Sequence, residues 1–136
     1  MAARILVADD DPDMRRLLRL ILRRRGYQII EARDGQETLA RASEERPDLI
    51  LLDIMMPRMS GFEVCRRLQA DKGTVHIPII FLTAKSDPVS RHKGLRLGAR
   101  DFISKMVGPK QLIKQIEQIL DSCQEDNVHL SLASQG

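Results

Sequence analysis

The sequence predicts an α/β fold in which a doubly wound, five-stranded parallel sheet carries helices on both of its faces. Three observations predict this class. Five short apolar runs alternate along the chain with segments of helical periodicity. The third and fourth runs are apolar at every position, which is typical of parallel strands buried on both faces. The chain has 136 residues, of which 43% are apolar, and this suits one domain with a buried core.

The predicted strands are short, and the helices between them have recognisable start signals. The strands span residues 5–8, 27–30, 49–52, 79–82 and 102–103. Capping residues and first-turn prolines mark the helix starts at Asp11-Pro12, Asp34 with Glu37, Ser60 with Glu63, Asp87-Pro88 and Gly108-Pro109. Gly26 and Gly98 mark two helix ends. Right-handed crossovers through these helices join the strands into one sheet.

The first and fifth helices each have a predicted buried face. In the first helix the apolar stripe consists of Met14, Leu17, Leu18, Ile21 and Leu22, and we expect the arginines to form a solvated face. In the fifth helix the stripe consists of Leu112, Ile113, Ile116, Ile119 and Leu120. After Asp121 the helical pattern fades. We therefore assign residues 1–121 to the domain and residues 122–136 to a tail, which is a linker, a pairing strand or the start of another domain.

Composition and charge exclude several classes of function. No apolar run approaches the ~20 residues of a membrane helix, and the first apolar stretch is too short for a secretory signal. We therefore expect a cytoplasmic protein without a membrane partner. The net charge is +3, but aromatic residues make up only 3%, so there is no platform for stacking bases and direct nucleic-acid binding is not expected. Cys65 and Cys123 match no metal-binding spacing and indicate reduced thiols.

Polar side chains follow four of the five predicted strands. Asp9 and Asp10 follow the first strand, Asp53 the third, Thr83 the fourth and Lys105 the fifth. Any one of them alone is better explained as a cap, a turn residue or a solvated charge. However, the carboxyl ends of parallel strands lie along one edge of the sheet, where ligands bind. Together these side chains therefore predict a functional site.

The residue types at this edge favour phosphoryl chemistry. Hard carboxylate ligands without a neighbouring histidine or cysteine suit Mg²⁺, which binds a few carboxylates and coordinates phosphoryl oxygens. Lys105 supplies a second positive charge, and Thr83 a hydroxyl, to surround the oxygens of a transferring phosphoryl group. A carboxylate can itself be the nucleophile and form an aspartyl phosphate. Asp53, at the end of the central strand, is the candidate.

Two other classes fit parts of the pattern. In a phosphatase-type hydrolase, Asp9 would be the nucleophile and Asp11 the acid, because an apolar strand precedes this Asp-x-Asp. No paired-acid motif follows later, and the chain is short for a substrate cap. A flavodoxin-like electron carrier fits the fold but would need a Ser/Thr phosphate loop and flanking aromatic residues, which the sequence lacks.

Four stretches at fixed spacings resemble the receiver domain of bacterial two-component response regulators, of the chemotaxis type. They are residues 5–11 (ILVADDD), 48–61 (DLILLDIMMPRMSG), 80–84 (IFLTA) and 98–105 (GARDFISK). The resemblance extends from Arg4 to about Leu120. It implies a flavodoxin-like sheet with the strand order 2-1-3-4-5.

The resemblance implies a role for each site residue. Asp53 would accept a phosphoryl group from a sensor histidine kinase or a histidine phosphotransfer protein. Mg²⁺ would be bound by Asp10, Asp53 and the backbone carbonyl of Met55, with Asp9 in support. Thr83 and Lys105 would contact the phosphoryl oxygens, and Phe102 would be the aromatic switch, which turns inward when the Thr83 hydroxyl is drawn to the phosphate. The protein would then be no enzyme beyond its own Mg²⁺-dependent phosphorylation and dephosphorylation.

The same resemblance places the output on the fourth and fifth strand–helix units. A homodimer through these units would use ion pairs among Arg91, Arg96, Arg100, Asp101, Lys114 and Glu117. Because the tail leaves no room for a DNA-binding or catalytic domain, we expect a downstream protein target or a missing output domain.

One departure from the family pattern concerns the residue after Lys105. The family usually has a cis proline there, whereas this chain has Met106. A cis bond before a residue other than proline costs ~2.5–4 kcal/mol, so we expect a trans bond and an altered loop, with Gly108 supplying slack. The main alternative is therefore an interaction module that keeps the receiver fold but signals without phosphorylation.

Overall fold

The computed structural model describes the backbone of residues 2–135 and the side chains of residues 2–123. Its five strands are β1 (Arg4–Ala8), β2 (Gln28–Ala32), β3 (Leu49–Leu52), β4 (Ile79–Thr83) and β5 (Asp101–Ser104). Its five helices are α1 (Pro12–Arg24), α2 (Gly35–Glu45), α3 (Gly61–Ala70), α4 (Pro88–Arg96) and α5 (Pro109–Gln135). All strand pairs are parallel, and their order is β2-β1-β3-β4-β5. The predicted fold class is confirmed.

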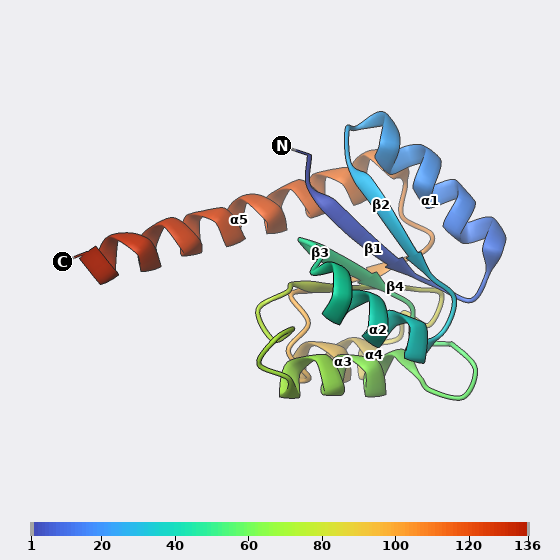
Figure 1. Cartoon of the computed structure of the whole chain (residues 1–136). Coiled ribbons are helices and arrows are strands. Elements are labelled where there is room, and N and C mark those ends of the chain that lie inside the picture. Colours follow the sequence, from blue (N-terminus) through green and yellow to red (C-terminus); the bar gives the residue numbers. More distant parts are fainter. Residues whose placement is uncertain (1, 136) are drawn as a thin grey trace.

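The sheet separates two layers of helices, each with its own apolar cluster (Figure 1). Successive strand residues point to opposite faces, so Leu6 and Ala8 of β1 belong to one cluster, and Ile5 and Val7 to the other. The first cluster includes residues of α2 and α3, and the second is covered by α1 and α5. Burial on both faces explains why the central strands are apolar at every position.

The predicted helix starts are confirmed by their caps. The side chains of Asp11, Asp34, Ser60 and Asp87 each accept a hydrogen bond from a backbone N–H of the first turn. Each cap satisfies a donor that the helix leaves without an internal partner. The reciprocal half of the α2 capping box differs from the expected pattern, because Glu37 accepts from the N–H of Arg33 instead of that of Asp34.

The structure corrects three details of the expected elements. The second strand begins at Gln28 rather than at Tyr27, because the N–H of Tyr27 bonds to the Leu22 carbonyl at the end of α1. Leu17 is 50% exposed and does not share in the buried stripe of α1. The arginines of α1 are not all solvated either, because Arg15 and Arg19 are half-buried against Glu31 of β2.

The tail is a helix rather than a pairing strand through residue 135. α5 continues as one helix to Gln135 and runs on beyond the sheet (Figure 1). Once a helix is nucleated, each added residue forms a hydrogen bond at little cost, and residues 122–135 contain no glycine or proline. The division at residue 121 stays a prediction, and residue 136 lies outside the described residues. Within the described part of the chain, no helix is both long and apolar enough to span a membrane.

Candidate functional site

The strand pairing places the acidic residues next to one another at the carboxyl edge of the sheet. The N–H of Asp53 donates to the carbonyl of Ala8, and the N–H of Asp9 donates to that of Ala32. Asp9 and Asp53 therefore directly follow the neighbouring strands β1 and β3, at the same level of the sheet. Carboxylate oxygens of Asp9, Asp10 and Asp53 all lie within 4.8 Å of one another. The structure thus brings together the three acids that the sequence pointed to.

Lys105 reaches this cluster from the far side of β4. Its Nζ lies 2.8 Å from Oδ2 of Asp9 and 3.0 Å from Oδ2 of Asp53. Its backbone N–H donates to the carbonyl of Thr83 at 3.0 Å, which ties the end of β5 to the end of β4. One ammonium group therefore bridges two carboxylates that come from different strands.

The loop after Lys105 keeps this geometry without a proline. No peptide bond in the described chain is cis, so the bond between Lys105 and Met106 is trans, as expected. Ser104 closes the turn, because its hydroxyl accepts from the N–H of Met106 and its carbonyl accepts from that of Val107. Met106 is 90% exposed. With methionine at position 106, Lys105 reaches both carboxylates.

The charges at the site are unbalanced. Burial raises the pKa of Asp9, and the nearby Asp53 carboxylate raises it further, against the opposing effects of Lys105 and the Asp11 N–H. Burial alone would lower the pKa of Lys105, but its contacts with Asp9 and Asp53 outweigh that effect and hold the pKa above its usual value. Three carboxylates thus face one ammonium group. Such a set of hard oxygen donors fits a divalent cation, and Mg²⁺ in particular.

Thr83 is the last residue of β4, and Phe102 lies within β5, opposite Phe81. Thr83 is fully buried, and its hydroxyl accepts from the N–H of Lys85 at 3.2 Å. The ring of Phe102 is 5% exposed and lies 5.9 Å, centroid to centroid, from that of Phe81. The aromatic side chain at the expected switch position therefore occupies an inward position in this structure.

Met55 follows Asp53 in the loop at the edge of the site. Its amide nitrogen lies 3.4 Å from Oδ1 of Asp53, a distance at the long limit for a hydrogen bond. Its side chain is 62% exposed. The position of Met55 leaves its backbone, rather than its side chain, next to the carboxylate.

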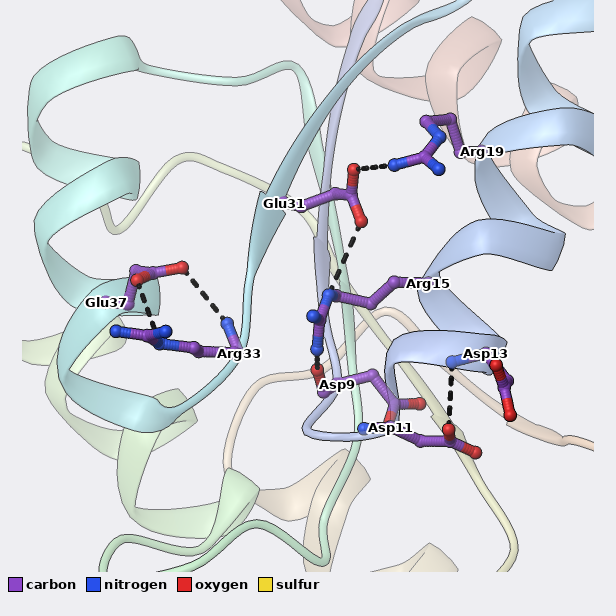
Figure 2. Close-up of polar contacts among 8 residues, drawn as sticks. All are labelled: Asp9, Asp11, Asp13, Arg15, Arg19, Glu31, Arg33 and Glu37. Carbon is purple, nitrogen blue, oxygen red and sulfur yellow. Dashed lines mark hydrogen bonds and ion pairs between the residues drawn. The ribbon is translucent and has the colours of Figure 1, made fainter.

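Sequence reasoning missed three residues that support the site. Arg15 donates from Nη1 to the carbonyl of Asp9 at 2.7 Å (Figure 2). Gly61 passes so close to the main chain of Asp53 that a Cβ atom there would overlap its carbonyl. Ser104 shapes the turn after Lys105. Only Gly61 carried a signal in the sequence, because a glycine directly after a helix cap can mark a close approach of two backbones.

The fold and this acidic edge define a family of signalling proteins. Residues 5–117 match the response regulator receiver domain. The chain therefore belongs to the response regulator receiver domain family of two-component systems, whose members are signalling modules and bind Mg²⁺ at an acidic pocket. This membership argues against the hydrolase and electron-carrier alternatives.

The curated relatives are longer than this chain. The chain is 45% identical over 116 residues to the DNA-binding response regulator MtrA of Mycolicibacterium smegmatis, a match that covers 85% of this chain and 50% of that protein. It is 42% identical over 120 residues to the alkaline phosphatase synthesis transcriptional regulatory protein PhoP of Bacillus subtilis, covering 88% and 49%. The chain thus spans about half the length of these curated relatives.

A solved structure matches over almost its whole length. The response regulator receiver domain protein (CheY-like) of Methanospirillum hungatei superposes with a TM-score of 0.87 at 28% sequence identity. The match covers 93% of this chain and 99% of that chain. The strand order and the helix layers described above are therefore those of a CheY-like receiver.

Proposed function

We propose that this chain is a cytoplasmic signalling receiver that accepts a phosphoryl group on Asp53 with the help of Mg²⁺. The observation that supports it best is the bridge from Lys105 to Asp9 and Asp53, within a cluster of three carboxylates. The bridge brings together residues from three strands in an arrangement that helix capping does not require. Together with the receiver family, it favours a phosphoacceptor over a purely structural acidic edge.

The proposed reaction is a transfer between two side chains. An Asp53 oxygen attacks phosphorus, and the new O–P bond forms as the bond to the imidazole nitrogen of a phosphohistidine breaks. The bonding electron pair stays on that nitrogen. The donor is a sensor histidine kinase or a histidine phosphotransfer protein, and a small acyl phosphate replaces it in self-phosphorylation. Water attack on the same phosphorus reverses the modification.

The residues around Asp53 have distinct proposed tasks. Asp10, Asp53 and the Met55 backbone carbonyl would hold Mg²⁺, which neutralises charge next to the phosphoryl oxygens, and Asp9 would support the site. Lys105 would move from the free carboxylate to a phosphoryl oxygen, since its ammonium already lies 3.0 Å from Oδ2 of Asp53. Thr83 would donate its hydroxyl to another oxygen.

Output is proposed to follow from a change of β4–α4 and β5–α5. Phosphorylation adds charge at the ends of these strands and biases them between two arrangements, with Thr83 and Phe102 as the coupled pair. The relatives named as DNA-binding regulators suggest an output domain, and a separate downstream protein is the other candidate. A homodimer through these units stays a prediction. Within the described chain, Arg91 donates to the Phe102 carbonyl and Glu117 pairs with Arg25, so dimer ion pairs would have to replace these contacts.

The test is phosphorylation of the purified chain by acetyl phosphate and Mg²⁺, followed by intact-mass measurement. We expect a gain of one phosphoryl group that is lost in Asp53→Asn and kept in Asp13→Asn, a matched change at an exposed carboxylate of α1. Omission of Mg²⁺ should abolish the gain. An unchanged mass, or a gain that persists in Asp53→Asn, would support the phosphorylation-independent interaction module instead.

A second comparison addresses the residue after Lys105. We expect the native chain and Met106→Pro to be phosphorylated at similar rates, because Lys105 reaches both carboxylates through a trans peptide bond. A silent native chain that is rescued by Met106→Pro would contradict this expectation.

A further inference from the structure

Arg15 of α1 contacts the main chain of the turn between β1 and α1, where Asp9 and Asp10 lie. The Arg15 guanidinium donates to the carbonyl of Asp9 at 2.7 Å, and its Nε lies 3.4 Å from Oε1 of Glu31 on β2 (Figure 2). The side chain of Arg15 is only 18% exposed. Because helical side chains point back toward the N-terminus of their helix, Arg15 reaches the turn between β1 and α1, where the acidic residues lie.

Glu31 holds this arginine in place. It lies opposite Val7 of β1 in the sheet, and it shares the face of Ile29, which packs against the cluster under α1 and α5. A carboxylate on a helix-covered face needs charged partners. Arg15 and Arg19 supply them, the latter with Nη1 at 2.6 Å from Oε2 of Glu31. The two arginines thus share one anchor, but only Arg15 also contacts Asp9.

The contact fixes the peptide unit between Asp9 and Asp10. The N–H of Asp9 is bonded to Ala32, its carboxylate accepts from Asp11 and Lys105, and its carbonyl accepts from Arg15. A peptide unit is planar, so holding that carbonyl also sets the direction in which the backbone enters Asp10. In the part of the chain that the structure describes, the exposed Asp10 carboxylate accepts no hydrogen bond. Its direction therefore depends on the backbone.

We propose that Arg15, anchored by Glu31, is a positioning residue that holds the Asp9–Asp10 peptide so that the Asp10 carboxylate faces Asp53. This inference rests on the proposed Mg²⁺ site. Groups that orient a metal ligand from behind typically change metal affinity by about 10–100-fold when they are removed. Arg15 acts through a backbone carbonyl and does not itself touch the bound ion.

The experiment compares two arginine variants of the full chain. The Mg²⁺ dissociation constant is measured by titration calorimetry for the wild type, Arg15→Met and Arg19→Met. Each variant removes one ion pair between α1 and Glu31, but only Arg15→Met removes the donor to Asp9. We expect about 10-fold weaker Mg²⁺ binding in Arg15→Met. In Arg19→Met the dissociation constant should change by no more than about twofold, because Arg19 does not contact Asp9.

Thermal unfolding in EDTA separates positioning from stability. Both variants should lose stability, because each breaks one partly buried pair with Glu31, and Arg15→Met should lose more because it also removes the donor to the Asp9 carbonyl. Equal Mg²⁺ affinities in the three proteins, or equal losses in both variants, would overturn the proposal. If Arg15→Met does not fold, the Mg²⁺ affinity of Arg15→Lys provides the test. Lysine keeps the positive charge but lacks the planar guanidinium group that contacts Asp9 and Glu31 together. Wild-type affinity in Arg15→Lys would then also overturn it.

The wild type distinguishes this inference from the function on which it depends. A wild-type chain that binds no Mg²⁺ refutes the proposed function itself. A wild-type chain that binds Mg²⁺ and is phosphorylated, next to an Arg15→Met variant with the same dissociation constant, refutes only the role of Arg15.

Discussion

Gly61 at the start of α3 packs directly against the main chain of Asp53, and its N–H donates to the carbonyl of Ile54 at 2.8 Å. A Cβ atom at position 61 would overlap the carbonyl of Asp53 and the Cα of Ile54. Both obstacles are backbone atoms, which cannot rotate away. The helix that follows the acidic loop is therefore docked against the phosphoacceptor candidate itself.

This contact predicts that Gly61→Ala damages both stability and the site. The loop and α3 must separate to admit the methyl group, and overpacking of this kind typically costs about 1–3 kcal/mol. Asp53 should move with the loop, so phosphorylation by acetyl phosphate should slow as well. Thermal unfolding and intact-mass kinetics measure the two effects.

Gly108→Ala is the matched control for this change. A methyl group at position 108 would meet no atom within 4 Å, and the backbone there is not left-handed. Alanine there should be neutral or slightly stabilising, because it reduces the freedom of the unfolded chain. Equal behaviour of the two alanine variants would contradict the close packing at Gly61.

The raised pKa of Asp9 predicts how the site affects stability with pH. Burial raises this pKa above 3.8, so just above pH 3.8 the folded state binds more protons at Asp9 than the unfolded state does. The contribution of Asp9 to the free energy of unfolding therefore falls as the pH rises through that window. Asp9→Asn removes this penalty, and we expect its melting temperature in EDTA at neutral pH to exceed that of the wild type by about 3 °C.

In the presence of Mg²⁺, the wild type should instead melt at a higher temperature than Asp9→Asn. Binding to the folded state alone stabilises the wild type by about 2.7 kcal/mol at a concentration 100 times the dissociation constant. Asp9→Asn should gain less from the same addition, because it offers one carboxylate fewer. Calorimetric scans with EDTA and with Mg²⁺ give both values. An Asp9→Asn variant that melts below the wild type in EDTA would show that the Lys105 contact outweighs the burial of the charge.

Local sequence patterns were sufficient to predict the elements and the acidic edge. The five apolar runs became the five strands, and the caps at Asp11 and Asp87 formed as expected. The gathering of Asp9, Asp53 and Lys105 followed from the rule that parallel strands end at one edge. These inferences needed only periodicity and topology.

The parts that could not be predicted depend on contacts between elements. An arginine on an amphipathic helix is ordinarily solvated, and nothing local shows that Arg15 finds both Glu31 and the carbonyl of Asp9. Leu17 fits the apolar stripe of α1, yet it is 50% exposed in the folded chain. The turn at Ser104 likewise replaces a family proline in a way that only the folded chain shows.

The pKa of Lys105 predicts an effect at high pH. Because Asp9 and Asp53 raise this pKa above 10.5, the stabilisation from the charged ammonium is fully present below pH 10.5 and is lost as the pH rises through the folded-state pKa. In EDTA at pH 8, Lys105→Met should be less stable than the wild type by about 2 kcal/mol. That difference should shrink above pH 10.5.

The control for this prediction is Lys110→Met, which removes an exposed lysine of α5. Its stability relative to the wild type should vary little over the same pH range. A Lys105→Met difference that is constant up to the alkaline limit of folding would show that the ammonium charge does not stabilise the acidic cluster.

The two cysteines should differ strongly in reactivity. Burial raises the pKa of the Cys65 thiol to about 11, and its Sγ lies 3.8 Å from the carbonyl of Leu97. Cys123 is only partly buried. Because the thiolate is the reactive form, a disulfide reagent at pH 8 should modify Cys123 in the folded protein and leave Cys65 intact. Denaturant should then expose the second thiol.

Cys123→Ser isolates the buried thiol. In that variant, labelling should occur only through unfolding, so its rate should follow denaturant concentration. Raising the pH from 8 to 9 should accelerate it, because the thiol reacts in the unfolded chain, where burial no longer raises its pKa. The protonated state of the folded thiol also means that the contribution of Cys65 to stability declines between pH 9 and about 11, where the unfolded chain releases the proton first. Rapid labelling of folded Cys123→Ser at pH 8 would show that the packing of α3 against the sheet opens locally.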